Sequence, residues 1–209
     1  MGLIRGSATF TRFYVDGNLT EDYAERLPDQ IKRFSFRRLD EHSISDRSTG
    51  WVNLMNIFST DFDAKEFLTP PYLTLSYRID SRNVPRNALT QHCLEAENEI
   101  KKAEGLEFIP RGKKKELRDF IWAQLIKRAI PKTSTYDMIW NLETSFVFFA
   151  ATSSKVIDEF SDIFFKTFNL APSPVYPLSL ARLNLETEDH NPAPLEALVP
   201  IDFKGGKEI

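Results

Sequence analysis

Cysteine is almost absent from this 209-residue sequence. The one cysteine, Cys93, has no partner for an internal disulfide bond. A cysteine-rich zinc site needs several cysteines and is therefore excluded as well. A chain without disulfides is typical of a reducing, cytosolic compartment. Cys93 lies at helical spacing beside the apolar residues Leu89 and Ala96, so we expect it to be a core residue rather than a nucleophile.

Long apolar runs are also missing. No stretch approaches the roughly 18 apolar residues that are needed to span a bilayer. The first ten residues, MGLIRGSATF, contain no apolar core of a signal peptide. The sequence therefore predicts a cytoplasmic protein that has no membrane partner.

The motifs of common cofactor and metal enzymes are absent as well. There is no GxxxxGK[ST] phosphate-binding loop and no GxGxxG dinucleotide fingerprint. The three histidines, His42, His92 and His190, form neither an HxxH nor an HExxH pair. We therefore predict no cofactor, no metal site and no catalytic residues.

Two acidic clusters keep a nuclease open as a less favoured alternative. A Mg²⁺-dependent exonuclease needs several acids that converge on one scissile phosphate. The clusters are Asp61, Asp63 and Glu66, and Asp158, Glu159 and Asp162. Because their spacing places them on turns and helix faces, we expect both clusters to be ordinary solvated acids.

The sequence is rich in hydrophobic residues, which make up 42% of it and include 17 phenylalanines. This composition predicts a folded globular protein with an apolar core. Alternating apolar residues predict strands, and apolar residues three or four apart predict helices. The expected strands are 7–15, 72–79, 135–142, 145–151 and 175–183, with either a strand pair or one strand and an extended loop within 43–58. The expected helices start at 20, 85, 113 and 154. This pattern predicts an α+β fold with antiparallel sheets, packed helices and a protruding helical hairpin.

The hairpin, over residues 85–132, carries a dense basic segment at its bend, IPRGKKKELRD. Residues 101–132 contain ten cations against four acids, although the whole chain has a formal net charge of −3. We predict that these cations bind DNA: Lys101, Lys102, Arg111, Lys113, Lys114, Lys115, Arg118, Lys127, Arg128 and Lys132. Because a charge acts over a Debye length of roughly 10 Å, such a patch can attract a polyanion despite an acidic total.

Two further observations bear on this hypothesis. Lysines at the start of a helix oppose the helix dipole, so their placement there favours a use in binding. Solvated charge runs are nevertheless common. The hypothesis therefore requires that Lys113 to Lys115 are not neutralised by acids of the same chain and that they lie on a shared surface.

Several segments together resemble the recombination-associated protein RdgC family. LIKRAI at 125–130 is similar to the family's LLPRAF, and PVYPLS at 174–179 is similar to its PVVPLS. The order of elements also agrees, from an early Gly-Trp pair through a lysine-rich helical hairpin to a strand pair and a helix.

This resemblance implies a protein that binds double-stranded DNA without sequence preference and restrains a recombinase. It also implies a ring-shaped homodimer that is associated with the nucleoid. Family chains usually extend further and use that extension in the ring, so this sequence resembles a short member. Ile130 stands where the family has an aromatic residue, and together with Phe108 it is our candidate for a dimer contact.

We expect four parts: an N-terminal α+β part (1–84), the basic hairpin (85–132), a second α+β part (133–185) and an acidic, proline-containing tail (186–209). Residues 181–209 hold six acids and three cations. A protein-interaction module with weak or no DNA binding, whose tail docks on a basic partner or on its own hairpin, is the alternative hypothesis.

Overall fold

The computed structural model describes residues 9–20, 22–187, 191 and 193–198. Its elements follow in the order β1 (Thr11–Val15), α1 (Tyr23–Arg33), β2 (Arg47–Val52), α2 (Ala64–Phe67), β3 (Leu68–Thr69), β4 (Tyr72–Ser81), α3 (Arg86–Glu104), α4 (Arg111–Arg128), β5 (Lys132–Asn141), β6 (Phe146–Phe149), α5 (Ser154–Phe168), β7 (Pro172–Pro174), α6 (Pro177–Thr187) and α7 (Ala193–Glu196). The predicted α+β class is confirmed.

One seven-stranded sheet organises the fold. The strands follow the order β2-β4-β5-β6-β1-β7, with β3 paired to β4, and every pair of named strands is antiparallel. β4 and β5 pair over ten residues, from Tyr72 opposite Asn141 to Ser81 opposite Lys132. We call this sheet, together with α1, α2 and α5, the head of the molecule.

The apolar core lies on the face of the sheet that α1 and α5 cover. Leu27 and Ile31 of α1 are fully buried, as the apolar spacing along this helix predicts. Phe160 of α5 stacks on Phe149 of β6 with ring centroids 3.9 Å apart. Trp51 of β2 is also fully buried, and its indole N–H donates to Thr167 Oγ1 at 2.8 Å. The aromatic residues of this core hold α5 against the sheet.

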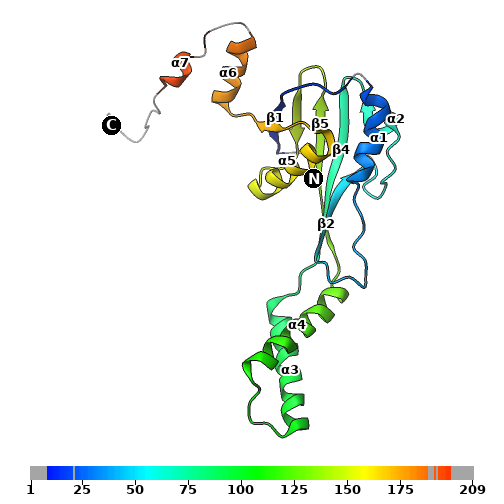
Figure 1. The fold of residues 1–209 in the computed structure, drawn as a ribbon, viewed down its shortest axis with the longest axis vertical. Helices are drawn as coiled ribbons and strands as arrows, with labels where there is room; N and C mark the ends of the chain where they lie inside the picture. Colours follow the sequence, from blue (N-terminus) through cyan, green and yellow to red (C-terminus); the bar gives the residue numbers. More distant parts are fainter. Residues whose placement is uncertain (1–8, 21, 188–190, 192, 199–209) are drawn as a thin grey trace.

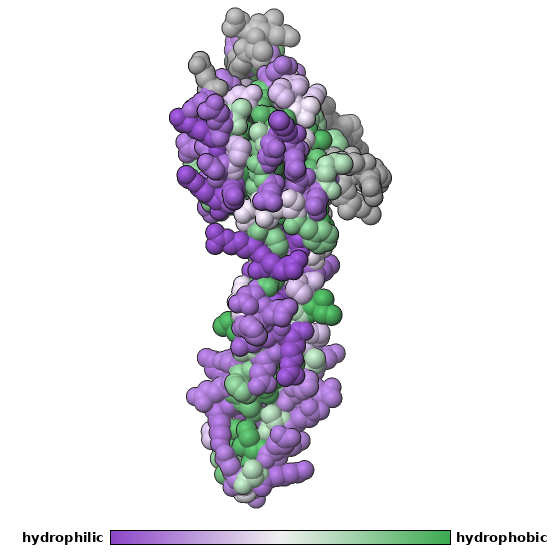
Figure 2. Space-filling view, turned by 90° about the vertical axis from the view of Figure 1, so that its right-hand side faces the viewer, coloured by the Kyte–Doolittle hydropathy of each residue, from purple (hydrophilic) through white to green (hydrophobic). Residues whose placement is uncertain are grey.

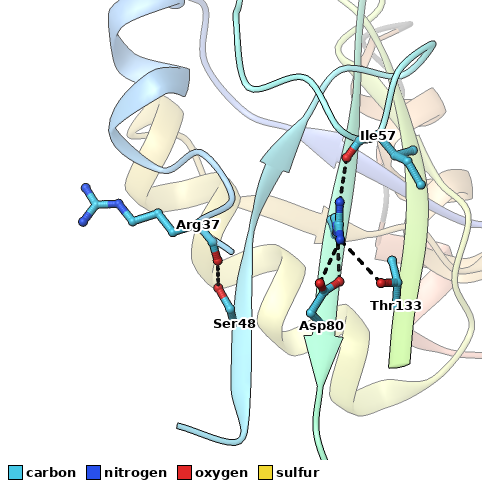
Figure 3. A network of polar contacts seen from close by, with 6 residues as sticks. Arg37, Ser48, Ile57, Asp80 and Thr133 are labelled. Carbon is cyan, nitrogen blue, oxygen red and sulfur yellow. Dashed lines mark hydrogen bonds and ion pairs between the residues drawn. The ribbon is translucent and has the colours of Figure 1, made fainter. Parts of the chain in front are cut away.

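The other face of the sheet buries charge. Side chains alternate along β4, so Arg78 and Asp80 point away from the apolar core. They form a two-pronged ion pair with both N–O distances at 2.8 Å (Figure 3). Arg78 also donates to the backbone oxygen of Ile57 at 3.0 Å, and its guanidinium lies over the Phe36 ring. The sequence analysis identified the strand but not this buried pair.

The helical hairpin of α3 and α4 projects from the end of the sheet at which β4 ends and β5 begins (Figure 1). Arg82, which follows β4, anchors this junction. Its Nη1 donates to the backbone oxygens of Asp40 and Ser43 at 3.1 and 3.3 Å. These bonds tie the base of the hairpin to the loop that precedes β2.

The predicted strand over 175–183 is wrong. Only Pro172–Pro174 pairs with β1, and the chain then forms the helix α6 from Pro177. Pro177 lacks a backbone donor for a sheet, whereas the first position of a helix accommodates proline. Ser179 Oγ accepts from the backbone N–H of Tyr176 at 2.7 Å, which caps the start of this helix.

Three other expectations are refined by the structure. The region 43–58 forms one strand, β2, followed by an extended loop. Pro28 lies inside α1, which continues through it from Tyr23 to Arg33. Ser153 occupies the capping position of α5, but its side chain makes no capping hydrogen bond.

Candidate nucleic-acid interface

The hairpin consists of two helices of 19 and 18 residues joined by a short bend. Gly105 ends α3 in the left-handed conformation, with φ of 67°, which a residue without a β-carbon adopts without strain. Pro110 then precedes the first residue of α4. The structure places the start of α4 at Arg111, so Lys113 to Lys115 lie near its N-terminus, and the first turn contains no acid that would compensate the helix dipole.

Two of the three consecutive lysines are engaged by acids of α3. Lys113 Nζ contacts Glu104 Oε2 at 2.7 Å, and Lys114 Nζ contacts Glu97 Oε2 at 2.7 Å. The requirement that all three lysines be free of acids of the same chain is therefore not met. The reason is that α3 and α4 run side by side, which brings acids from α3 next to lysines that follow in α4.

The charge of the hairpin is accordingly smaller than the window 101–132 indicated. That window left out three acids of α3, Glu95, Glu97 and Glu99, and one cation, Arg86. From Arg86 to Lys132 there are eleven cations and seven acids, a formal balance of +4. The hairpin remains basic, while the whole chain is acidic.

The remaining lysine of the run shares a groove with two other cations. Lys114, Lys115 and Arg118 of α4 line a hollow of about 370 Å³ together with Leu89 and Cys93 of α3. Neither Lys115 nor Arg118 has an ion pair with any residue in the part of the chain that the structure describes. Glu97 also lines the hollow, but its ion pair is with Lys114, so Lys115 and Arg118 are the cations there that no ion pair with a described residue holds.

The groove continues toward the base of the hairpin. Arg86, Arg118 and Trp122 line an adjoining hollow of about 390 Å³, which shares Leu89 and Arg118 with the first. Asp119 is the acid at this second hollow. Arg86, which the sequence analysis missed, therefore joins the predicted cation Arg118 along one side of the hairpin.

The other predicted cations do not lie at this groove. Lys101 and Lys102 are in the last turn of α3 and Arg111 begins α4, so these three lie near the bend. Lys127, Arg128 and Lys132 lie at the opposite end, next to the head. Since an 18-residue helix is about 27 Å long, the ten cations cover the length of the hairpin rather than one spot.

Both candidate dimer contacts are exposed. Phe108, in the bend, has 74% of its surface accessible, and Ile130, after α4, has 90%. Phe120 and Leu94 are further exposed apolar residues on the hairpin, which the sequence analysis did not single out. Figure 2 shows a mainly hydrophilic hairpin surface in that view, with an apolar strip running toward its tip.

Two acids of each acidic cluster have partners within the protein. Asp63 Oδ1 accepts from the backbone N–H of Lys65 at 3.1 Å, and Glu66 accepts from Asn53 at 2.7 Å. In the second cluster, Glu159 pairs with Arg47 and Asp162 pairs with Lys166. Over the described ranges, no three His, Cys, Asp or Glu side chains are grouped so that they could hold a metal ion.

Three other expectations concern the tail, a membrane span and Cys93. Most of the acidic tail, and His190 with it, lies outside the described residues. Within the residues that were described, none of the helices is both long and apolar enough to cross a bilayer. Cys93 is half-buried at the groove between α3 and α4 rather than in the main core.

Comparison with known proteins places this architecture in one family. A protein-family model described as "Putative exonuclease, RdgC" matches residues 11–187. No curated protein matches the chain closely enough to count as a relative. The matched region begins with β1 and ends with α6, so it includes the sheet, the core helices and the whole hairpin. The chain therefore belongs to the RdgC family.

Proposed function

We propose that this protein binds double-stranded DNA without sequence preference, through the basic groove of its hairpin, and thereby modulates homologous recombination. In this proposal it works as a homodimer at the nucleoid and restrains the recombinase that assembles on DNA. Membership of the RdgC family and the positive balance of the hairpin support the proposal.

The physical basis is the charge density of the ligand. Duplex DNA carries one negative charge per about 1.7 Å of its axis, so cations along a groove bind it through released counterions. Such contacts position a protein on the backbone and carry no sequence information. A projecting pair of helices gives these cations access to a duplex that the broader head cannot approach as closely.

One observation carries the proposal more than any other. Lys115 and Arg118 lie on the same groove, and neither has an acidic partner among the described residues. Lys113 and Lys114 have carboxylate partners, and the Lys113–Glu104 pair is an exposed one of the kind that contributes only about 0–1 kcal/mol. Glu97, the partner of Lys114, is 17% exposed and therefore holds its lysine more firmly. We therefore assign the main phosphate contacts to Lys115 and Arg118, with Arg86 beside them.

The test reverses the charge of this pair. We expect K115E/R118E to weaken retardation of a short duplex at least about tenfold and to lower the log–log salt slope by about 2, since each phosphate contact contributes about 0.9. The matched control is K65E/K155E, which changes the net charge equally at two exposed sites on the head. Thermal unfolding of all three proteins checks that the fold is retained.

If K115E/R118E and K65E/K155E weaken binding equally, the groove has no special role and only the total charge matters. Retention of wild-type affinity by K115E/R118E would also refute the assignment. Either result would favour the alternative hypothesis of a protein-interaction module, because that hypothesis does not require the hairpin to bind DNA.

A second candidate function rests on the description of the family, which names an exonuclease. If the protein is a Mg²⁺-dependent nuclease, end-labelled duplex incubated with excess protein and Mg²⁺ is shortened over time, and EDTA stops the loss. We expect no shortening, because two acids of each cluster are engaged by side chains or backbone groups of the head. EDTA-sensitive degradation would establish the nuclease instead.

A further inference from the structure

A second concentration of positive charge lies on the head. The segment KRFSFRR, residues 32–38, places four cations in seven positions at the end of α1 and in the loop that follows. Two of them, Arg33 and Arg37, line an open pocket of about 580 Å³ together with residues of β2, β4 and α5. This volume lies within the range of about 300–1,000 Å³ that is usual for small-ligand sites.

The charges around the pocket do not cancel. Four cations and two acids line it. Arg47 is paired with Glu159, and Lys166 Nζ is paired with Asp162 Oδ2 at 2.6 Å. Arg33 and Arg37 have no ion-pair partner anywhere in residues 9–20 or 22–187. The pocket therefore has a formal excess of two positive charges, both of them guanidinium groups.

The backbone that carries these two arginines is fixed on both sides. Arg33 lies in the last turn of α1, where the helix dipole stabilises a cation. The backbone oxygen of Arg37 accepts from Ser48 Oγ of β2, and the N–H of the preceding residue, Phe36, donates to the Trp51 oxygen at 2.9 Å. Figure 3 shows the Arg37 side chain extended away from the sheet edge. Because these backbone contacts are already formed, a ligand that binds the two arginines would require little reordering of the main chain.

The rest of the wall combines hydroxyl groups and apolar residues. Tyr77 and Thr49 line the wall with hydroxyl groups that hydrogen-bond to each other, and Phe34 and Ile163 are apolar residues of the lining. Burial raises the pKa of Tyr77 above its ordinary value of 10.0, and the hydrogen bond with Thr49 acts in the opposite direction. Guanidinium groups that have no acidic partner suit the oxygens of a phosphate group, which arginine binds through two parallel N–H bonds.

We propose that this pocket on the head binds phosphate groups through Arg33 and Arg37. It lies apart from the hairpin groove and does not require that the groove binds DNA. The phosphate comes either from the backbone of a nucleic acid or from a soluble nucleotide, and the two sources share the chemistry that the pocket recognises.

The experiment compares R33A/R37A with K32A/R38A, a control that removes two cations of the same segment that do not line the pocket. Binding of inorganic pyrophosphate and of AMP is measured by calorimetry, and binding of a short duplex by fluorescence anisotropy. We expect R33A/R37A to weaken pyrophosphate binding at least about tenfold, because two charge-assisted contacts are lost, and K32A/R38A to bind nearly as wild type. R33K/R37K keeps both positive charges but loses the parallel N–H donors of the guanidinium groups, so it should bind pyrophosphate with intermediate affinity.

The ligands distinguish the source of the phosphate. If R33A/R37A also weakens duplex binding, the pocket contacts the nucleic-acid backbone. If only pyrophosphate and AMP are affected, the ligand is a soluble nucleotide. Equal losses in R33A/R37A and K32A/R38A, or no pyrophosphate, AMP or duplex binding that depends on Arg33 and Arg37, would overturn the proposal. Because pyrophosphate and AMP need no DNA, failure of the hairpin proposal leaves a different pattern, with pocket binding intact and duplex binding absent.

Discussion

Arg78 and Asp80 lie two positions apart on β4, so both side chains emerge on the same face of the sheet. They are 6% and 4% exposed, and their ion pair is completed by the backbone oxygen of Ile57 and by the rings of Phe36 and Phe58. A buried pair of this kind adds little net stability compared with apolar residues, but removal of one partner leaves an uncompensated charge. The pair therefore holds the loop that contains Ile57 against the sheet.

Asp80→Asn tests this residue-scale claim. At neutral pH we expect a loss of about 3 kcal/mol in unfolding free energy, because Arg78 remains buried without a counter-charge. The pKa of Asp80 lies below its ordinary value of 3.8: burial by itself raises it, but hydrogen bonds from Arg78 and Thr133 and nearby positive charge outweigh burial. The contribution of Asp80 is thus present at neutral pH and is lost as the pH falls through the folded-state pKa.

The measurement is chemical denaturation of wild type and D80N followed by circular dichroism at several pH values. The stability gap between the two proteins should be constant from pH 7 to about 5 and should shrink below about pH 4. D61N changes an exposed acid and serves as the control, with an expected effect within about 0.5 kcal/mol. A gap that persists unchanged into the acid transition would contradict the ionic role of Asp80.

At the scale of elements, the segment after α1 packs directly on the backbone of β2. Ser35 and Trp51 form a parallel bridge, and the N–H of Trp51 donates to the Phe34 oxygen at 2.9 Å. Gly50 makes this approach possible, because a β-carbon there would lie within 2.6 Å of the Ser35 carbonyl carbon and still closer to Phe36. The same packing positions Arg37 at the pocket on the head that we propose to bind phosphate groups.

Replacing each of two glycines by alanine separates the effect of close packing on stability from the effect of helix propensity. Gly50→Ala should destabilise the protein by about 1–3 kcal/mol, since rigid backbone surrounds the added methyl group. Gly112→Ala, in the first turn of α4 with open space around it, should be neutral or stabilising by up to about 1 kcal/mol. Thermal unfolding of both variants measures the difference. Equal effects would show that β2 can move away from the segment that follows α1.

At the scale of the whole molecule, the hairpin extends the chain well beyond the head (Figure 1). Its two candidate dimer contacts lie at opposite ends, with Phe108 in the bend and Ile130 next to the head. A two-fold interface that contains both must therefore extend along the whole hairpin, over about 27 Å, with the two hairpins either antiparallel or parallel. Parallel contact between the tips would use Phe108 alone.

Single substitutions distinguish these arrangements. If the hairpins pair along their whole length, Phe108→Ser and Ile130→Ser should each lower the mass measured by light scattering toward that of one chain. If only the tips meet, Phe108→Ser should have this effect and Ile130→Ser should not. Thr90→Ser, on the exposed part of α3, is a mild control on the same hairpin. A wild-type protein that is monomeric at all concentrations would reject both arrangements.

The sequence by itself determined most elements, because their signals are local. Apolar spacing placed Leu27 and Ile31 in the core, and Pro85 and Gly105 marked the beginning and end of α3. The hairpin and its basic character were predicted for the same reason. The strand expected over 175–183 failed because alternating leucines fit a short strand or a helix equally, and Pro177 with Ser179 decided for the helix.

Only the tertiary structure decided which charges are available. Lys113 and Lys114 look equivalent to Lys115 in the sequence, yet α3 places an acid beside each of the first two. Arg33 and Arg37 likewise lie far from Glu159 and Asp162 in the chain, but share one pocket with them. Helix and strand formation depends on neighbours along the chain, whereas the field at a charged group depends on every neighbour in space.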